Sequence, residues 1–122
     1  MSTGGFEYFI NQKRNVAVIS FVGKADRSHI DHFAKCYDQV GALPCRFVVF
    51  NFTGVTGIAA ELDPALVRLQ VLVREAGREV SVCGLSSELK KRLTDSGIIR
   101  SYETYSSLVE ALQKIVSSGG DK

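Results

Sequence analysis

The chain has 122 residues, of which 45% are hydrophobic and 23% charged, proportions near the average for folded globular domains. They exclude a disordered chain, which combines low hydrophobicity with high net charge, and the length suits one domain with one core. Its 15 basic and 13 acidic residues leave a formal net charge of +2. That charge is too small to predict binding to nucleic acid, which requires the neutralisation of many phosphates.

The sequence shows no targeting or membrane-spanning pattern. No apolar run approaches the roughly 20 residues that cross a bilayer, and the polar residues 1–5 lack the basic and apolar regions of a signal peptide. We therefore expect a cytoplasmic protein without membrane insertion. The cysteines Cys36, Cys45 and Cys83 form no C-x-x-C pair, so we expect them to be small buried hydrophobic residues without a disulfide, redox or metal role.

The predicted elements begin with a β-hairpin. Residues 6–10 and 16–22 run or alternate apolar on either side of the polar segment 11–15, which is typical of two antiparallel strands joined by a turn. The glycine and charged residues of 23–26 are expected to end the second strand. Apolar residues at helical spacing over 30–40 then predict the first helix, which a glycine ends.

A central strand and a second helix are predicted next. Residues 46–52 are apolar at nearly every position, which is typical of a strand covered on both faces. We expect 53–60 to form a loop, after which Asp63 and Pro64 are interpreted as the cap and first residue of a helix that ends at Gly77. The apolar stripe of this helix comprises Leu62, Ala65, Leu66, Leu69, Val73 and Ala76.

The C-terminal third is predicted to add two strands and two helices. Residues 79–85 and 98–102 have the composition of strands. Residues 86–93 and 104–116 have helical spacing, the last helix carrying Leu108, Leu112 and Ile115 inward.

The order of these elements predicts the fold class. Helices between successive strands require crossover connections, so the order β-β-α-β-α-β-α-β-α indicates one α/β domain. It should contain a mixed, mostly parallel sheet of about five strands with about four helices. We expect this domain over 6–116, with flexible ends at 1–5 and 117–122.

Catalytic and metal sites find little support in the sequence. His29 and His32 lie at i and i+3 on the first predicted helix beside Asp31, but neither a third histidine nor a cysteine at ligand spacing completes a metal site. A Cys–His pair stays open, although nothing supports it. The glycines of 54–57 match neither the dinucleotide-binding nor the Walker pattern. We expect no enzymatic activity, no cofactor and no metal, and histidines that are solvated or cap the helix.

The segment from Thr53 to Glu61 is the predicted functional region. It follows the central strand, and in open α/β sheets ligands and partners meet the loops at the carboxyl ends of parallel strands. Glu61 and Asp63 are open to two interpretations: they stabilise the helix N-terminus through its dipole or as caps, or they form a charged surface that a partner senses. Val67 and Val71 lie off the inward stripe and either meet a neighbouring helix or form a docking face.

Four stretches of the chain, taken in their order along the sequence, carry a resemblance to a known family. They are an apolar strand ending in Gly-Lys-Ala-Asp over 21–26, a strand and loop over 48–58, a strand and helix ending in Gly-Ile over 83–98, and a closing segment over 102–112. In this order they resemble the STAS family, the domain of bacterial anti-sigma factor antagonists, over about residues 6–115. The resemblance implies the same α/β fold and a protein partner.

The resemblance also implies a switch that this chain lacks. In the family, the loop before the second helix carries Asp-Ser-Ser/Thr-Gly, and a partner kinase phosphorylates the serine or threonine, which releases the anti-sigma factor. Here Ala59 and Ala60 replace the aspartate and the phosphosite, and alanine has no oxygen to phosphorylate. Glu61 supplies one fixed negative charge, less than the roughly −1.5 to −2 of a phosphate. If the switch has moved, Thr53 and Thr56 are the nearest hydroxyl groups.

Protein binding is therefore the predicted function. The expected partner is a kinase-type anti-sigma factor or a related protein. The alternative is a regulatory or scaffold subunit of a transporter or multi-STAS complex; an enzyme or nucleotide-binding protein is a third reading, and homodimerisation stays open. The residues expected at the partner interface are Asp26, Thr53, Gly54, Thr56, Gly57, Ile58, Ala59, Ala60, Glu61, Leu62, Val67 and Val71.

Overall fold

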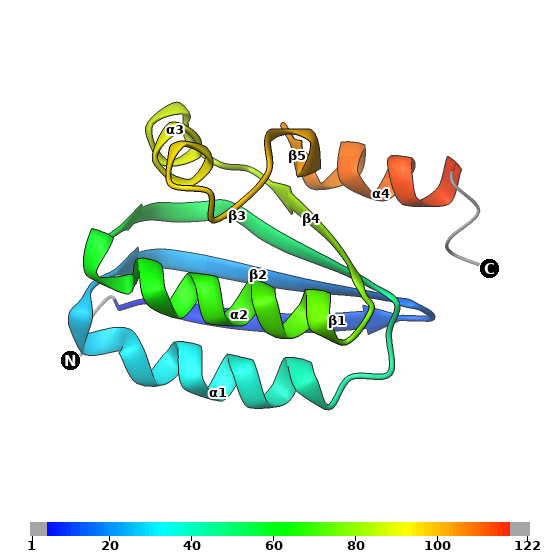
Figure 1. The fold of residues 1–122 in the computed structure, drawn as a ribbon, viewed down its shortest axis with the longest axis horizontal. Helices are drawn as coiled ribbons and strands as arrows, with labels where there is room; N and C mark the ends of the chain where they lie inside the picture. Colours follow the sequence, from blue (N-terminus) through cyan, green and yellow to red (C-terminus); the bar gives the residue numbers. More distant parts are fainter. Residues whose placement is uncertain (1–4, 118–122) are drawn as a thin grey trace.

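The computed structural model describes residues 5–117, and Figure 1 shows a single sheet with helices on both faces. The elements are β1 (Glu7–Lys13), β2 (Val16–Ala25), α1 (Ile30–Gly41), β3 (Phe47–Ile58), α2 (Asp63–Glu75), β4 (Glu79–Cys83), α3 (Ser87–Asp95), β5 (Thr104–Tyr105) and α4 (Leu108–Ser117). Short 3₁₀ helices precede α1, α2 and β5: η1 (Arg27–His29), η2 (Ala60–Leu62) and η3 (Ser101–Glu103). Within the described residues, no helix is long and apolar enough to cross a membrane.

The sheet confirms the predicted topology. Its strands are ordered β1-β2-β3-β4-β5, with β1 antiparallel to β2 and the other neighbours parallel. Parallel neighbours need crossovers that pass over a face of the sheet. Accordingly α1 and α2 cover one face and α4 part of the other (Figure 1). The predicted central strand is β3, the middle strand of the five.

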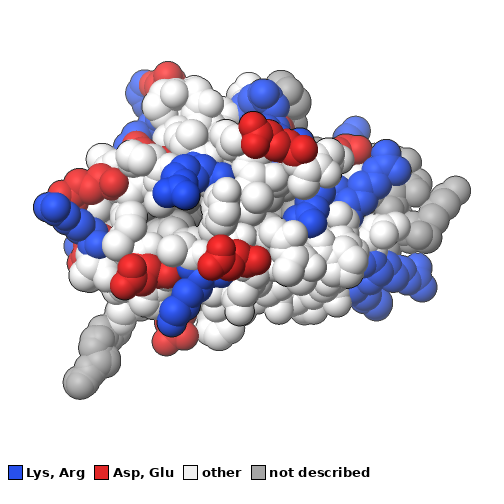
Figure 2. Space-filling model, turned by 60° about the horizontal axis from the view of Figure 1, so that its bottom comes forward, with Lys and Arg blue, Asp and Glu red and all other residues white. Residues whose placement is uncertain are grey.

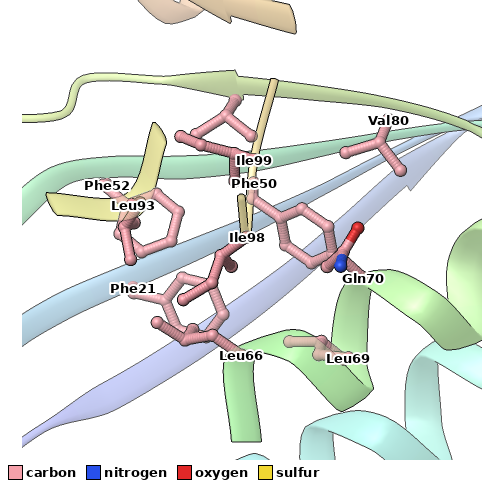
Figure 3. A pocket seen from close by; sticks show the side chains of 11 residues that line it. Phe21, Phe50, Phe52, Leu66, Leu69, Gln70, Val80, Leu93, Ile98 and Ile99 are labelled. Atoms are coloured by element: carbon pink, nitrogen blue, oxygen red, sulfur yellow. The ribbon is translucent and has the colours of Figure 1, made fainter. Parts of the chain in front are cut away.

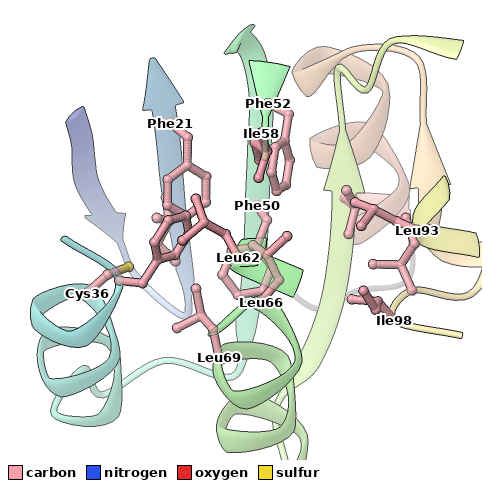
Figure 4. Packing of buried hydrophobic residues seen from close by; sticks show 14 of the residues in the cluster. Phe21, Cys36, Phe50, Phe52, Ile58, Leu62, Leu66, Leu69, Leu93 and Ile98 are labelled. Atoms are coloured by element: carbon pink, nitrogen blue, oxygen red, sulfur yellow. The ribbon is translucent and has the colours of Figure 1, made fainter. Parts of the chain in front are cut away.

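The alternation of side chains along β3 explains its nearly continuous apolar run. Phe50 and Phe52 belong to the larger core on the side of α1 and α2, whereas Phe47 and Val49 belong to the smaller core beneath α4. Figure 4 shows the larger core, in which Phe21 of β2 and Phe50 stack with ring centroids 6.3 Å apart. Burying each large apolar side chain contributes roughly 1.5–3 kcal/mol, so this strand anchors both layers.

The larger core leaves one small cavity. Its volume is about 20 Å³, room for about one water molecule. Figure 3 shows the cavity among aromatic and aliphatic side chains, with Gln70 as the polar member of its lining. A lining of this kind makes it a packing defect of the core and not a ligand site.

The hairpin turn is shorter than predicted. β1 continues to Lys13, which pairs with Val16, so that Arg14 and Asn15 alone connect the strands. Arg14 adopts the left-handed φ of 57° that such a tight connection needs. The polar residues 11–13 belong to the strand and not to the predicted turn. They suit a strand with one face open to solvent, since exposed and half-buried residues alternate along β1.

Two strands extend beyond their predicted ends. β2 continues through the segment 23–26 as far as Ala25, and β3 runs through the predicted loop as far as Ile58. The two extensions pair with each other, Ala25 opposite Ile58, which supplies the backbone hydrogen bonds that neither segment could have alone. Gly23, Gly54 and Gly57 lie at or beside irregularities in this ladder, and the ladder continues past them.

The region after α3 also differs from the prediction. Ile98 and Ile99 form no strand; both are buried, and both of their N–H groups donate to Leu93 O, at 3.0 and 3.3 Å, where α3 ends. The last strand is Thr104–Tyr105, within the predicted helix, and α4 starts only at Leu108. A two-residue strand has too little periodicity to be recognised from sequence.

Smaller differences concern helix ends and the termini. Leu66, Leu69 and Val73 of the predicted stripe are buried in α2, but Ala76 is exposed after its last turn. On α4, Ile115 is buried and Leu108 and Leu112 are half-buried. The predicted flexible ends fall outside the described residues except for Gly5 and for Ser117, which is the last residue of α4.

Candidate functional site

The predicted functional segment lies at the carboxyl end of the sheet, on a two-stranded extension. β3 pairs with β4 only as far as Asn51 and Cys83, and continues to Ile58 beside β2 alone. The extension closes where Ala59 N–H donates to Ala25 O at 2.9 Å. Thr53 to Ile58 are therefore held by a strand ladder and do not form a free loop, which corrects the prediction.

An asparagine stabilises the start of this extension. Between the pairs Ser20–Asn51 and Val22–Gly54, β3 contains one residue more than β2, which is the definition of a bulge. Asn51 Oδ1 accepts hydrogen bonds from Thr53 N–H at 3.1 Å and from its hydroxyl at 2.6 Å. Asn51 Nδ2 donates to Ser20 Oγ at 3.1 Å. The Thr53 hydroxyl is thus engaged within the chain.

The extension forms one wall of a groove of about 260 Å³. Five of the residues expected at the interface line this groove: Asp26, Thr56, Gly57, Ile58 and Ala59. The opposite wall comes from α3 and its N-terminus, with Ser86, Glu88, Leu89 and Arg92. The prediction did not include this wall, because α3 follows more than 25 residues later in the sequence.

Arg92 is the residue of the site that the sequence did not reveal. Its Nη1 donates to Ile58 O at 2.8 Å and its Nη2 to Asp63 Oδ1 at 3.0 Å, while its Nε is buried without a partner among the described residues. One guanidinium therefore connects α3 to the end of β3 and to the start of α2. In sequence it belongs to a basic run with Lys90 and Lys91, but these are exposed and Arg92 is half-buried.

The two acidic residues before α2 have different roles. Asp63 is not the predicted cap, because it is already the first residue of α2, where it pairs with Arg92. The residues at the cap positions, Ala59 before η2 and Leu62 before α2, make no side-chain cap hydrogen bond. Glu61 is exposed in the first turn of η2. A negative charge at this position interacts favourably with the dipole of the following helix, and the Glu61 carboxylate is accessible to a partner.

The two alanines occupy the turn between the strand and the helix. Ala60 is exposed as the first residue of η2, and Ala59 is half-buried. Ile58 and Leu62, also expected at the interface, lie in the larger core with 6% and 0% of their surfaces exposed. The accessible part of the turn therefore consists of Ala60 and Glu61.

The second half of the expected interface lies on α2. Val67 is 37% exposed, which confirms that it lies off the inward stripe, and Val71 is half-buried. Beside them, the Arg68 guanidinium lies over the Tyr37 ring, 5.4 Å from its centroid. Cation–π contacts of this kind contribute about 0.5–1 kcal/mol at exposed sites, so Arg68 helps to hold α1 against α2.

Asp26 and His29 organise the first turn before α1. Asp26 accepts from the Ser28 side chain and from its N–H, and these hydrogen bonds hold the pKa of Asp26 below its ordinary value. Nδ1 of His29 lies 3.0 Å from Asp26 N and Nε2 lies 3.3 Å from Phe6 N. Because an imidazole ring accepts at only one of its nitrogens, we assign the shorter contact, from Asp26 N–H to Nδ1, as the hydrogen bond that caps the turn. The prediction of a capping histidine is confirmed for His29, and Asp26 adds an exposed negative charge to the groove.

Of the three cysteines that we expected to be buried, Cys36 and Cys83 are buried, whereas Cys45 is only half-buried. Burial raises the pKa of Cys36 to about 12 and that of Cys83 to about 11, so both thiols are protonated at neutral pH and are poor nucleophiles. His32 was expected to be solvated or to cap the helix, but it is half-buried, and its ring packs at the edge of the Phe6 ring. No group of three or more His, Cys, Asp or Glu side chains in the described part of the chain is arranged to hold a metal ion.

Comparison with known proteins gives a family match and a shared fold. The family model of the STAS domain matches residues 9–111, whereas no curated protein matches the sequence. An anti-sigma factor antagonist from Mycobacterium paratuberculosis has a TM-score of 0.76 at 14% identity, over 94% of this chain and 97% of that one.

Two further solved structures have similar scores. RsbS from Moorella thermoacetica has a TM-score of 0.76 at 16% identity, over 92% of this chain and 97% of that one. The STAS domain of a SulP transporter from Vibrio cholerae has a TM-score of 0.77 at 14% identity, over 92% and 89%. At such identities the likeness shows the fold alone.

Proposed function

Since this chain belongs to the STAS domain family, we propose that it is a protein-binding regulatory module, not an enzyme, that works without phosphorylation at position 60. The observation that carries the proposal is the turn between β3 and α2. Its accessible residues are Ala60 and Glu61, so the surface offered to a partner is a methyl group beside a fixed carboxylate.

The charge of this surface follows from Arg92. Asp63 is neutralised by the Arg92 guanidinium at 3.0 Å, which leaves Glu61, Asp26 and, on the α3 wall of the groove, Glu88 as the exposed carboxylates of the site. A phosphoserine would add about two negative charges and change the surface on demand. The side chains present hold it in one charge state, so binding is constitutive with respect to phosphate at this position.

The partner we propose is a kinase-type anti-sigma factor or a related protein. The surface that it would meet comprises the edge of the groove at Thr56, the turn at Ala60 and Glu61, and the exposed Val67 of α2. These residues combine apolar contact with a negative charge at a helix N-terminus, the two features that partner docking and charge discrimination need.

A second candidate function has support of its own. The fold is equally similar to the STAS domain of a SulP transporter, and that similarity favours a regulatory or scaffold subunit of a larger assembly. In both cases the binding surface is the same, and the difference lies in the class of protein bound.

Affinity capture from native lysate, followed by mass spectrometry, tests the proposal. Wild type is compared with Glu61→Arg, and with Glu75→Arg as a matched control, because Glu75 is exposed at the other end of α2. An anti-sigma kinase captured by wild type and the control, but lost with Glu61→Arg, supports the first function. A transporter or multi-STAS complex with the same dependence supports the second. If the Glu61→Arg variant captures the same partner as wild type does, the proposed surface is contradicted.

A further inference from the structure

A second cleft lies at the opposite end of the sheet, where β4 begins. It has a volume of about 470 Å³ and lies between the C-terminal part of α2, η3, β4 and α4. The charged side chains of its lining are four cations and two carboxylates: Arg74, Arg78, Arg100, Lys114, Glu79 and Glu103. The proposed function uses none of them.

The cleft exists because β5 is short. β5 pairs only with Val82 and Cys83, so residues 79–81 of β4 pair with β3 on one side and have no strand neighbour on the other side among the described residues. Glu79 N–H donates to Arg46 O at 2.8 Å. In a parallel ladder alternate residues bond to opposite sides, and the N–H and C=O of Val80 therefore point away from β3, into the open edge.

Two of the cations form the fixed wall of the cleft. Arg74 donates to both carboxylate oxygens of Glu103 at 2.6 Å, and Arg78 donates to Val40 O and Leu43 O at the end of α1, both at 2.6 Å. Burial opposes the ionisation of Glu103, which is 7% exposed, but the hydrogen bonds from Arg74 and from the Arg100 N–H outweigh it and hold its pKa below the ordinary value.

The rim of the cleft carries the other cations. Arg100 lies 3.5 Å from Glu103 and is 53% exposed, and Lys114 is exposed on α4. The wider surface has the same sign: in Figure 2, Lys and Arg side chains gather at the right-hand end, which in Figure 1 holds the β1–β2 turn and the connection from α1 to β3. On the face that Figure 2 shows, basic side chains are therefore concentrated at this end of the molecule.

We propose that this cleft binds an acidic, extended peptide segment of a partner protein, which adds as a strand to the open edge at Val80. Main-chain hydrogen bonds to the edge supply affinity, as in other cases of strand addition. Carboxylates of the peptide meet Arg100 and Lys114 at the rim and select against basic segments. The inference is independent of the site between β3 and α2, so either can fail without the other.

The test uses the full chain and a short fluorescein-labelled peptide of alternating Glu and Val. At low ionic strength its fluorescence anisotropy is expected to rise with protein concentration, whereas a Lys–Val peptide gives no change. Lys114→Glu is expected to weaken binding about tenfold, because it places a like charge at the rim. Lys91→Glu, an exposed position on α3 at the other end, is the control and leaves the affinity unchanged.

Two readouts separate strand addition from loose attraction between charges. A Glu–Val peptide with N-methylated amides keeps its charge but cannot form the ladder, and it is expected not to bind. Hydrogen exchange at the Val80 amide is expected to slow on addition of the parent peptide. The proposal is overturned by absence of binding at low salt, by equal binding of the N-methylated peptide, by displacement with inorganic phosphate at matched ionic strength, or by unchanged exchange at Val80.

Discussion

Arg92 and Asp63, 29 positions apart in sequence, form a 3.0 Å hydrogen bond that joins α3 to the first turn of α2. The same guanidinium also binds the last carbonyl of β3, that of Ile58. The turn that carries Ala60 and Glu61 lies between these two anchor points. A side chain outside the predicted segment therefore determines the geometry of the surface at which we propose that a partner binds.

Removal of this guanidinium is expected to destabilise the domain. Arg92→Ala leaves the Asp63 carboxylate and the Ile58 carbonyl without their donor, which costs roughly 1–3 kcal/mol. The free energy of unfolding in urea measures the change. Lys90→Ala, on the exposed side of the same helix, is the matched control and should stay within about 0.5 kcal/mol of wild type. Arg92→Lys should recover only part of the loss, because one ammonium cannot replace the planar fork. Equal stability of Arg92→Ala and the control would show that the hydrogen bonds from Arg92 to Asp63 and Ile58 do not stabilise the domain.

Incubation with a cognate kinase and ATP is expected to add no phosphate at Ala60, as intact-mass spectrometry will show. The triple variant Ala59→Asp, Ala60→Ser, Glu61→Ser restores the hydroxyl and should accept one phosphate. The wild-type chain is the control. If the variant is not phosphorylated by any anti-sigma kinase of the source organism, the partner-switching interpretation loses its support.

Phosphate found elsewhere in the wild-type chain would show that the switch has moved. Thr53 and Thr56 are both exposed, but the Thr53 hydroxyl donates to Asn51 Oδ1 at 2.6 Å, so Thr56, in the groove, is the more available candidate. We therefore expect any such phosphate on Thr56, and Thr56→Val should abolish it. Modification of Thr53 in preference to Thr56 would contradict this order.

Two glycines separate backbone strain from steric contact. Gly84 has φ +76° and Gly97 φ +79°, but a Cβ added at Gly84 would lie 2.5 Å from Thr53 N, whereas one at Gly97 would meet nothing within 4 Å. Gly97→Ala should cost about 1–2 kcal/mol for the left-handed conformation alone. Gly84→Ala should cost a further 1–3 kcal/mol or so, because the strand extension must shift. Chemical denaturation measures both, and equal losses would exclude the contact.

Stability is expected to fall at alkaline pH through Cys36. Burial raises its pKa in the folded chain from 9.0 to about 12, so between these values the unfolded chain releases a proton that the folded chain keeps. The unfolded state is thereby favoured as pH rises from about 9 to 12. The urea midpoint of wild type should fall more steeply over this range than that of Cys36→Ala. Parallel curves for the two proteins would show that Cys36 does not contribute.

Local patterns in the sequence were sufficient for the main elements. β3 could be recognised because burial on both faces leaves an unbroken apolar run, and α1 and α2 because burial on one face leaves a 3.6-residue period. That residue 60 is an alanine, which has no hydroxyl, is likewise a fact of the sequence alone. Each of these properties depends on neighbouring residues, and so each could be read without the fold.

The remaining features depend on residues that are distant in sequence. β3 extends to Ile58 because β2 supplies its hydrogen bonds. β5 is two residues long because only Thr104 and Tyr105 pair with β4. In sequence Arg92 is one of three consecutive basic residues, and only folding places it against Asp63 and Ile58. The cationic cleft arises in the same way, since Arg74, Arg100 and Lys114 come together only when the sheet edge forms. Hydrogen bonding and electrostatics act through space, so their partners are set by topology and not by spacing along the chain.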